Sequence, residues 1–344
     1  MVDLLVSTEQ QQIIDSVVDF LSVELPLARL RPDGNNRPDS ALWPIMGELG
    51  WFMTSLTEAQ GGLGLSAVEE ALLFRQLGRH LLTPNVLASA IGARVAAAAG
   101  VDELAAAIAS GQQPVALGNA VGRVSIGARI SGRFHLFDAA GMPLLLLTDG
   151  VGNAALVATA SLSLLPRPSA VDAMSLHEAR LDAVAPLALA GPDLGAHVTL
   201  RLLAASMLAG VCEQTRDLAT DYAKLRVQFG QPIGAFQAIK HKCADLALRA
   251  DAVGHLVNFA SIRVANRAED AVFQATAAKL LGAQYALINA KETIQIHGGI
   301  GFTTECDAHH FLKRAHVYDL IGGGYRQQQR FLLEEPAPGE EPVA

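Results

Sequence analysis

Two glycine-containing stretches near the C-terminus decide the fold: Gln295-Ile-His-Gly-Gly-Ile-Gly-Phe-Thr-Thr-Glu305 and Tyr318-Asp-Leu-Ile-Gly-Gly-Gly324. In the first, Gly298 and Gly299 follow a helical pattern, and paired glycines there are typical of a helix C-cap. The same missing side chains would let a phosphate or a ribose lie close to the backbone. The second stretch lacks the lysine and the following serine or threonine of a P-loop. A capping role and a ligand-binding role therefore both stay open for these glycines.

A third motif, Arg226-Val-Gln-Phe229-Gly, lies upstream and is followed by Phe236 and Gln237. We expect Arg226 in the last turn of a helix, where a cation interacts favourably with the helix dipole. Phe229 is expected on the same face, and Phe236 and Gln237 at the start of the next helix. An exposed arginine and an aromatic ring beside a helix N-terminus suit a pyrophosphate and a flat ring system. The spacing alone does not separate this ligand site from a structural role.

Hydrophobic periodicity divides the rest of the chain into helical and β segments. Near the N-terminus, helical segments are expected over 8–23, 41–50, 66–80 and 88–109. Ser7 or Thr8 is the expected N-cap of the first, and Ser66 caps the one that runs to 80. Short apolar runs between 115 and 184, bounded by Gly, Asp, Asn and Pro, predict a small antiparallel sheet of about six strands. Four long helices are then expected over 200–229, ended by Gly230, and over 236–267, 269–296 and 307–318. Their short connections predict a helical bundle.

The predicted fold class is therefore mainly α with a small β-domain. We expect an N-terminal helical domain over 1–112, a reduced middle β-domain over 113–188 and a C-terminal four-helix bundle over 189–334. Residues 335–344, rich in Glu and Pro, are expected to form a disordered tail.

Composition excludes several classes of protein. Hydrophobic residues make up 51% of the 344 residues and charged ones 17%, which predicts a packed globule. The net charge of -8 comes from scattered acidic residues, and no Lys/Arg stripe indicates a nucleic-acid partner. Without a signal peptide or an uninterrupted apolar run of about 18 residues, we expect no membrane association and a cytoplasmic location.

Cysteines and histidines give no metal or disulfide signature. Cys212, Cys243 and Cys306 are too few and too far apart for a disulfide framework. His309, His310 and His316 cluster in the sequence, but adjacent histidines are expected on different helix faces, and no i, i+4 pair with a nearby carboxylate occurs. No metal site is predicted.

Taken together, the motifs resemble those of the acyl-CoA dehydrogenase family. They occur in the same order as in that family and cover nearly the whole chain. Glu48-Leu-Gly50 with Gly61-Gly-Leu-Gly64 is similar to the N-terminal domain signature of that family. Arg226-x-x-Phe229-Gly with Gln237 is similar to its flavin-binding helix junction, and Gln295-x-x-Gly-Gly to its adenosine-side loop. The resemblance implies the three-part fold predicted above.

The resemblance further implies an FAD cofactor that lies between subunits. It assigns the FAD contacts to Arg226, Phe229, Phe236, Gln237, Gln295, Gly298, Gly299, Gly323 and Gly324. The implied reaction is α,β-dehydrogenation of an acyl-CoA thioester: a carboxylate removes the α-proton while the β-hydride goes to the flavin. Electron-transfer flavoprotein is the implied electron acceptor.

Three departures from the family pattern concern this reaction. The catalytic glutamate expected near the C-terminus aligns with Gly322 or Gly323. Some family members place the base just before an arginine early in the first bundle helix. Here the residue that resembles this substrate-proximal arginine is Arg201, and the residue before it is Leu200. The middle domain is short and lacks the Tyr-x-x-Thr-Glu-Pro and Trp-x-Thr-Asn-Gly stretches that cradle the flavin ring. Glu305 and Asp319 have ordinary structural explanations and are not nominated as the base.

These losses resemble the subunit without a catalytic glutamate in heteromeric acyl-CoA dehydrogenases of bacterial steroid side-chain degradation. The leading hypothesis is a subunit of an α2β2 enzyme that contributes the trans half of the FAD site, with a partner that carries the glutamate. Two alternatives stay open: a homomeric dehydrogenase with an unrecognised base, and a flavin-free scaffold or acyl-CoA-binding protein.

Overall fold

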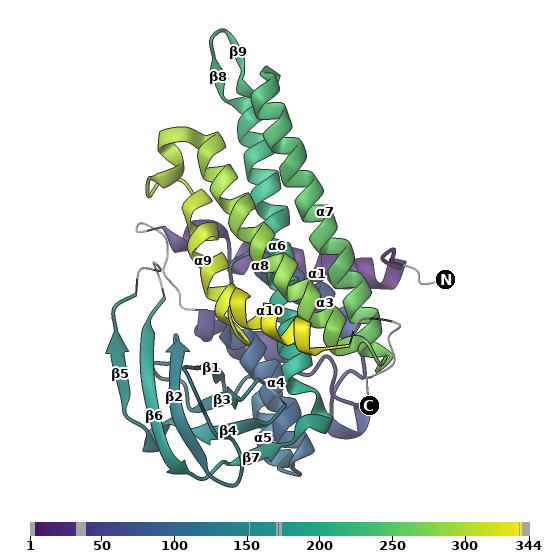
Figure 1. Cartoon of the computed structure of the whole chain (residues 1–344), viewed down its shortest axis with the longest axis vertical. Helices are drawn as coiled ribbons and strands as arrows, with labels where there is room; N and C mark the ends of the chain where they lie inside the picture. Colours follow the sequence, from purple (N-terminus) through teal and green to yellow (C-terminus); the bar gives the residue numbers. More distant parts are fainter. Residues whose placement is uncertain are drawn as a thin grey trace.

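The computed structural model describes residues 4–31, 39–150, 152–169, 171, 174–336 and 338. Figure 1 shows a long helical bundle, a β-sheet at one end of it, and N-terminal helices packed against its side. The predicted mainly α architecture with a small central sheet is confirmed. The expected disordered tail over 335–344 lies largely outside the described residues.

The N-terminal helices are α1 (Thr8–Glu24), α2 (Trp43–Glu48), α3 (Ala67–Arg79), α4 (Asn85–Ala98) and α5 (Asp102–Ala109). Local sequence explains two of their starts, because Ser7 and Ser66 accept backbone N–H bonds and both form capping boxes. The helical segment expected over 88–109 forms two helices, α4 and α5. It is broken at Gly100, whose φ of 72° is left-handed and ends α4 before α5 begins.

The sheet contains β1 (Val115–Ala120), β2 (Ile130–Phe137), β3 (Leu144–Thr148), β4 (Ala154–Ala158), β5 (Leu164–Arg167), β6 (Leu176–Val184) and β7 (Ala188–Ala190). Their order is β5-β6-β2-β1-β3-β4-β7, seven strands rather than about six. The expectation of a wholly antiparallel sheet is wrong at one pair, because β1 and β3 are parallel. β2 pairs with one edge of β1 in the opposite direction, and β3 pairs with the other edge in the same direction as β1.

The two faces of the sheet are buried differently. Leu117, Leu146 and Leu156 belong to the main core, which continues into α4. Side chains at alternate positions, including Phe134 and Leu145, form a separate core on the opposite face. The face that carries Leu117, Leu146 and Leu156 thereby anchors the sheet to α4.

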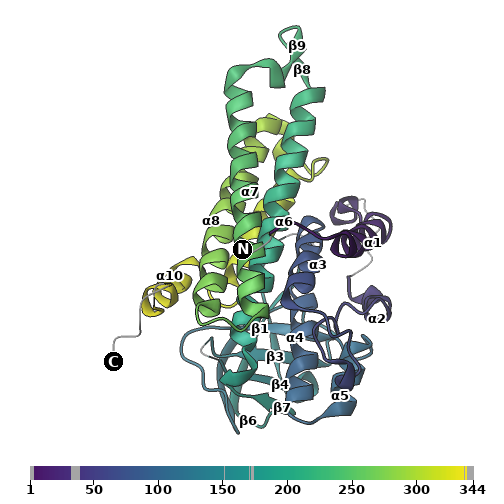
Figure 2. The same cartoon turned by 90° about the vertical axis from the view of Figure 1, so that its right-hand side faces the viewer.

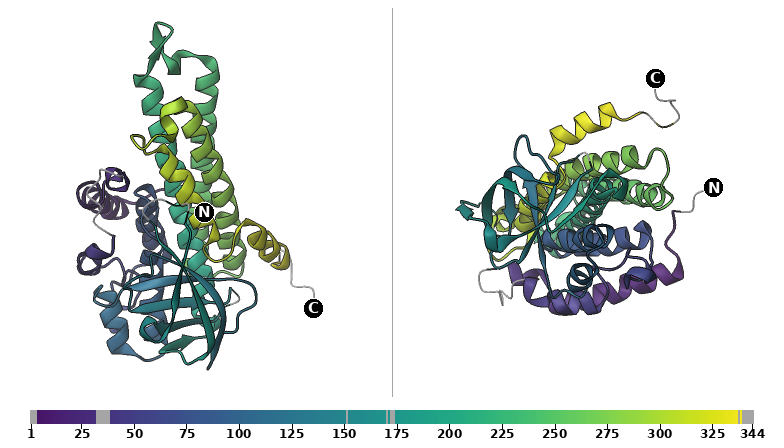
Figure 3. Two further views of the ribbon diagram at one scale, coloured as in Figure 1. Left: turned by 90° about the vertical axis from the view of Figure 1, so that its left-hand side faces the viewer. Right: turned by 90° about the horizontal axis from the view of Figure 1, so that it is seen from below.

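The C-terminal helices are α6 (Ala196–Leu225), α7 (Gln237–Ala265), α8 (Ala271–His297), α9 (Ala308–Leu320) and α10 (Tyr325–Glu334). Figure 2 shows α6, α7 and α8 side by side along the length of the molecule. The last of the four predicted helices, over 307–318, is confirmed as α9, which has 13 residues. The pattern did not predict α10 as a separate helix. In Figure 3, the N-terminal helices lie on one side of the bundle and α10 on the other.

Helix α6 is the central element of the bundle. The stretch Pro192–Leu225 is long and apolar enough to cross a membrane, but 78% of its apolar window is buried inside the protein. It packs against α3, α7 and α8. Its apolar character is therefore that of a core helix.

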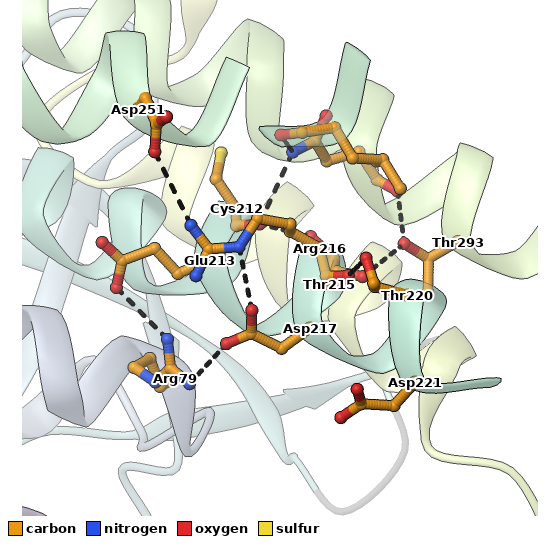
Figure 4. Close-up of polar contacts among 12 residues, drawn as sticks. Arg79, Cys212, Glu213, Thr215, Arg216, Asp217, Thr220, Asp221, Asp251 and Thr293 are labelled. Carbon is orange, nitrogen blue, oxygen red and sulfur yellow. Dashed lines mark hydrogen bonds and ion pairs between the residues drawn. The ribbon is translucent and has the colours of Figure 1, made fainter. Parts of the chain in front are cut away.

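Charged side chains join the N-terminal helices to the bundle (Figure 4). Arg79 of α3 contacts Glu213 at 3.3 Å and Asp217 at 2.8 Å, both on α6. Arg216 contacts Asp217 at 2.8 Å and Asp251 of α7 at 3.6 Å. Because Arg79 and Glu213 are largely shielded from water and belong to a network, they hold α3 against α6, whereas the exposed Asp251 of α7 contributes less.

Candidate functional site

The predicted site residues fall into two groups at opposite ends of α6. Leu200 lies in the second turn of this 30-residue helix and Arg226 directly after its end. At about 1.5 Å per residue the two positions are about 40 Å apart. One group therefore lies where the sheet meets the bundle, and the other at the distal end of the bundle. We call them the sheet-end group and the distal group.

The distal group begins at a hairpin that the sequence did not reveal. Helix α6 ends at Leu225 rather than at Phe229, so the prediction of Arg226 in its last turn is off by one residue; Arg226 is the C-cap. Strands β8 (Val227–Gln228) and β9 (Gln231–Pro232) then form a β-hairpin with a two-residue turn. Phe229 and Gly230 form its turn with φ of 52° and 81°. This left-handed pair is what a type I′ turn requires.

Phe229 is an unusual residue for that turn. Its positive φ carries a steric cost of about 1–2 kcal/mol that asparagine or glycine would avoid or reduce. Its ring is 94% exposed and contacts Phe236 edge to face, with ring centroids 6.1 Å apart. A strained backbone that presents an apolar ring to water is typical of a binding surface.

The end of α8 contributes the second part of the distal group. Gln295 is exposed on the last turn of α8, and Gly298 follows the helix with a φ of 68°. A methyl group built on Gly298 or Gly299 would meet no atom within 4 Å. The glycines therefore leave open space beside the backbone, as a ligand that lies close to it would need.

A ring stack joins the two parts of the distal group. Tyr222, in the last turn of α6, stacks on His297 at a centroid distance of 4.3 Å and an interplanar angle of 20°. The motifs around Arg226 and Gly298 are thus neighbours in space. The guanidinium of Arg226 is exposed and has no ion pair or hydrogen bond within the described part of the chain. It is free to bind an anion.

At the sheet end, the structure brings together both positions where a catalytic carboxylate was expected. A Cβ built on Gly322 would lie 3.6 Å from Leu200 Cδ2 and 3.7 Å from Arg201 Cγ. The start of α6 and the turn between α9 and α10 therefore line the same place. Neither position supplies a proton acceptor.

The backbone of this turn disfavours a glutamate. Gly322 and Gly323 have φ of 66° and 102°, which L-residues rarely adopt. A Cβ on Gly323 would also lie 2.9 Å from Gln327 Oε1. The buried Gln328 holds the turn in place, since its Nε2 donates to the carbonyls of Gly322 at 2.6 Å and Gly323 at 3.0 Å.

A cavity of about 310 Å³ lies between this turn and the sheet. Gly322, Gly323 and Gly324 form one wall, and His135 and Asp149 are on the sheet side. The carboxylate of Asp149 accepts the backbone N–H groups of Gly152 and Asn153 at 3.1 and 3.0 Å. It stabilises its own loop.

Arg201, the predicted substrate-proximal residue, is only 3% exposed. It donates to the carbonyl of Gly150 at 3.0 Å and to Thr276 Oγ1 at 3.3 Å, and its guanidinium lies 4.4 Å from the ring centroid of Phe331. Burial lowers the pKa of Arg201 to about 10, so it stays protonated at neutral pH. Arg201 thus fixes α10 and the loop after β3 to the bundle.

Lys279 is a second buried cation at this end, and the motifs did not indicate it. It is fully buried, donates to the backbone carbonyl of Asp319 at 2.8 Å, and lies 3.9 Å from Asp319 Oδ1. Burial lowers the pKa of Lys279 to about 8. Asp319 therefore has a structural role as the counterion of Lys279.

His197, one turn before Arg201, gives the chain a pH-dependent stability. Burial, followed by the Arg201 charge, lowers the pKa of its imidazole from 6.5 to about 4. The unfolded chain therefore binds a proton before the folded one does, and stability is lost as the pH falls from about 6.5 towards about 4. After allowance for partial exposure, we expect a loss of about 1 kcal/mol between about pH 7 and about pH 5.

Urea unfolding at a series of pH values checks this expectation. The matched variant is His197→Gln, which cannot titrate and should flatten the pH dependence over that range. His80 and His297 also have pKa values lowered by burial and leave a residual slope. An identical slope in wild type and His197→Gln would contradict the assignment.

Adjacent histidines on α9 also depart from expectation. His309 and His310 were expected on different helix faces, but their rings lie 4.1 Å apart, centroid to centroid, and both are buried. Within the described ranges, no three His, Cys, Asp or Glu side chains gather as a metal site would require.

The family models agree with the order of these elements. Residues 7–111 match the model for the acyl-CoA dehydrogenase N-terminal domain, and residues 198–335 the model for the C-terminal domain. The acyl-CoA dehydrogenase IpdE2 of Mycobacterium tuberculosis is 31% identical over 279 residues, which span 81% of each chain. The chain belongs to the acyl-CoA dehydrogenase family. The acyl-CoA dehydrogenase FadE34 of the same organism is 35% identical over 300 residues, 82% of this chain but only 40% of FadE34.

Solved structures show that the acyl-CoA dehydrogenase fold extends over nearly the whole chain. The ChsE4-ChsE5 complex from Mycobacterium tuberculosis contains a chain with a TM-score of 0.82 at 22% identity, covering 98% of this chain and 100% of that one. A Tcur3481-Tcur3483 steroid acyl-CoA dehydrogenase variant gives 0.82 at 23% identity, with 95% and 96% covered. PigA with FAD and proline gives 0.84 at 18% identity, with 97% and 98% covered. At these identities the likeness concerns the fold alone.

Proposed function

We propose that this chain is one subunit of an FAD-dependent acyl-CoA dehydrogenase, and that it supplies the trans half of the FAD site without a catalytic base. One observation carries the proposal. Arg226, Phe229 and the glycines after α8 form an exposed surface at the bundle end remote from the sheet of their own chain. A cofactor held there needs a second subunit to enclose it.

FAD is the cofactor of the site. The distal residues fit it by their chemistry, since Arg226 offers a pyrophosphate an exposed guanidinium that has no partner among the described residues, and Phe229 offers an exposed ring. Gly298 and Gly299 leave the open space beside the backbone that a ribose or phosphate needs. Phe236, Gln237 and Gln295 complete the proposed contact surface, with Gly323 and Gly324 assigned to the sheet end. FAD when bound supplies the hydride acceptor of the dehydrogenation.

The base of the reaction is assigned to the partner. Gly322, Gly323 and Leu200 occupy the positions where the catalytic carboxylate was expected. The left-handed backbone and the nearby Gln327 side chain disfavour a glutamate at position 323. Removal of an α-proton from an acyl-CoA requires a carboxylate within hydrogen-bond reach. Nearby, Asp149 and Asp319 are engaged with their own loop and with Lys279.

The partner is proposed to be a second acyl-CoA dehydrogenase chain, in an α2β2 assembly that uses electron-transfer flavoprotein as acceptor. The similar ChsE4-ChsE5 structure is itself described as a complex of two different proteins. The similar Tcur3481-Tcur3483 structure is described as a steroid enzyme, which favours steroid side-chain degradation. We place the assembly in the cytoplasm.

The proposal is tested by the visible spectrum and the native mass of the chain, purified alone and after co-expression with a candidate partner. Alone, the chain should be colourless and unreactive towards acyl-CoA. With the partner it should form a larger, yellow hetero-oligomer that an acyl-CoA bleaches. A yellow homo-oligomer bleached by acyl-CoA would show that the chain brings its own base, and a colourless hetero-oligomer would favour a flavin-free scaffold.

A further inference from the structure

One face of α8 carries a row of polar side chains that ends at the distal group. Asn289, Thr293 and His297 are spaced by four residues, so they lie one above another on the same helix face. Asn289 and Thr293 are fully buried. Buried polar groups need hydrogen-bond partners, and the Asn289 amide nitrogen and the Thr293 hydroxyl find them on neighbouring helices.

The row fixes α8 against the other two long helices. Asn289 Nδ2 donates to the carbonyl of Leu246 on α7 at 3.1 Å. Thr293 Oγ1 contacts the carbonyl of Thr215 on α6 at 3.0 Å, a contact drawn in Figure 4. A slip of α8 along α6 would leave these buried groups unpaired, which is costly.

His297 ends the row and contacts α6 through its ring. Its Nδ1 lies 2.8 Å from the carbonyl of Thr293. Since a carbonyl only accepts, Nδ1 carries the proton and donates. The ring is thereby held in one orientation, face to face with Tyr222.

Tyr222 contacts both halves of the distal group. Its ring stacks on His297, the residue directly before Gly298 and Gly299. Its backbone carbonyl accepts the N–H of Arg226 at 2.9 Å. One residue therefore sets the position of the glycine loop relative to the arginine.

We propose that Tyr222 and His297 are positioning residues of the distal half-site, which hold Gly298 and Gly299 at the separation from Arg226 that one pyrophosphate-containing ligand requires. This inference rests on the proposed function. Neither side chain has to touch the ligand, because the stack acts through the two backbone segments that it joins. Loss of the stack should loosen the half-site while the buried part of the row keeps the bundle folded.

The test measures the FAD dissociation rate of the assembled complex, followed by the recovery of flavin fluorescence. Tyr222→Leu and His297→Leu should each raise this rate about three- to tenfold, as the loss of an aromatic pair suggests. Tyr222→Phe keeps the ring stack on His297 and should retain the wild-type FAD dissociation rate. His297→Asn offers a donor to Thr293 without a ring and should behave like His297→Leu, so it carries the test if a leucine variant does not fold.

Tyr285→Leu is the matched control for general destabilisation of the bundle. Tyr285 lies on α8 and packs against the main core, away from the distal group. This variant should lower the Tm and leave the FAD dissociation rate unchanged. If instead the FAD dissociation rate rises in every variant in proportion to the loss of Tm, Tyr222 and His297 act only as core residues and the positioning role is wrong.

Arg226→Ala separates this inference from the proposed function. If Arg226→Ala accelerates FAD loss and the Tyr222 and His297 variants do not, the positioning role is wrong and the half-site stands. If none of the variants changes FAD binding, the half-site itself is wrong, and this inference falls with it.

Discussion

Gly210→Ala is expected to destabilise the chain by about 3 kcal/mol or more, enough to prevent folding of a marginally stable domain. Helices α3 and α6 cross with their backbones in contact at this point. A Cβ on Gly210 would lie 2.0 Å from the carbonyl oxygen of Arg75 and 2.7 Å from the nitrogen of Arg79. The same holds from the other side, where a Cβ on Gly78 would lie 2.1 Å from the carbonyl oxygen of Met207. Because both obstacles are backbone atoms, only separation of the helices relieves the clash.

Gly282→Ala is the matched control, since Gly282 is also a helical glycine that faces α6. Its Cβ would approach Leu208 Cβ to 3.3 Å, so a shift of only a few tenths of an ångström between the two helices relieves the contact. The better helix propensity of alanine, about 1 kcal/mol, offsets that cost. Urea unfolding should therefore separate the two variants clearly. Equal midpoints would show that α3 and α6 do not cross at the separation described.

Arg226→Ala is expected to weaken FAD retention by the assembled complex about tenfold or more. The loss of a charge-assisted hydrogen bond of roughly 1.5–3 kcal/mol corresponds to this factor. The exposed guanidinium has no described partner whose loss would disturb the fold, so the Tm of the chain should stay within experimental error. The measurement is the FAD content of the complex after dialysis, together with the dissociation rate.

Lys224→Ala controls for a general effect of positive charge at the distal end. Lys224 is 69% exposed in its side chain, lies two residues before Arg226, and contacts Asp221 at 3.3 Å. Its removal should change FAD retention by less than about twofold, as expected for an exposed ion pair. Unchanged flavin content in Arg226→Ala would remove Arg226 from the cofactor site.

Local sequence signals predicted the elements whose boundaries are set locally. The caps at Ser7 and Ser66 act on N–H groups a few residues away, and the periodicity of the long helices is a property of each segment alone. The hairpin after α6 escaped prediction for a related reason. Phe229 occupies a turn position where Asn or Gly is the usual signal, so the sequence indicated a longer helix.

Pairing between distant segments could not be read from the sequence. The parallel pair β1 and β3 depends on which edge of β1 remains free after β2 has paired. Likewise, periodicity does not specify the close approach of the His309 and His310 rings, which were expected on different helix faces. Such outcomes follow from long-range packing, which periodicity does not specify.

By itself the sequence determined the resemblance to the family and the absence of a carboxylate at Gly322, Gly323 and Leu200, because these are matters of residue identity and spacing. Only the tertiary structure decided that Leu200 and Gly322 meet in one place while Arg226 lies about 40 Å away at the other end of α6. The physical reason is the rigidity of a continuous 30-residue helix, which fixes the separation of its ends. Which other segments gather at each end is set by the packing around it.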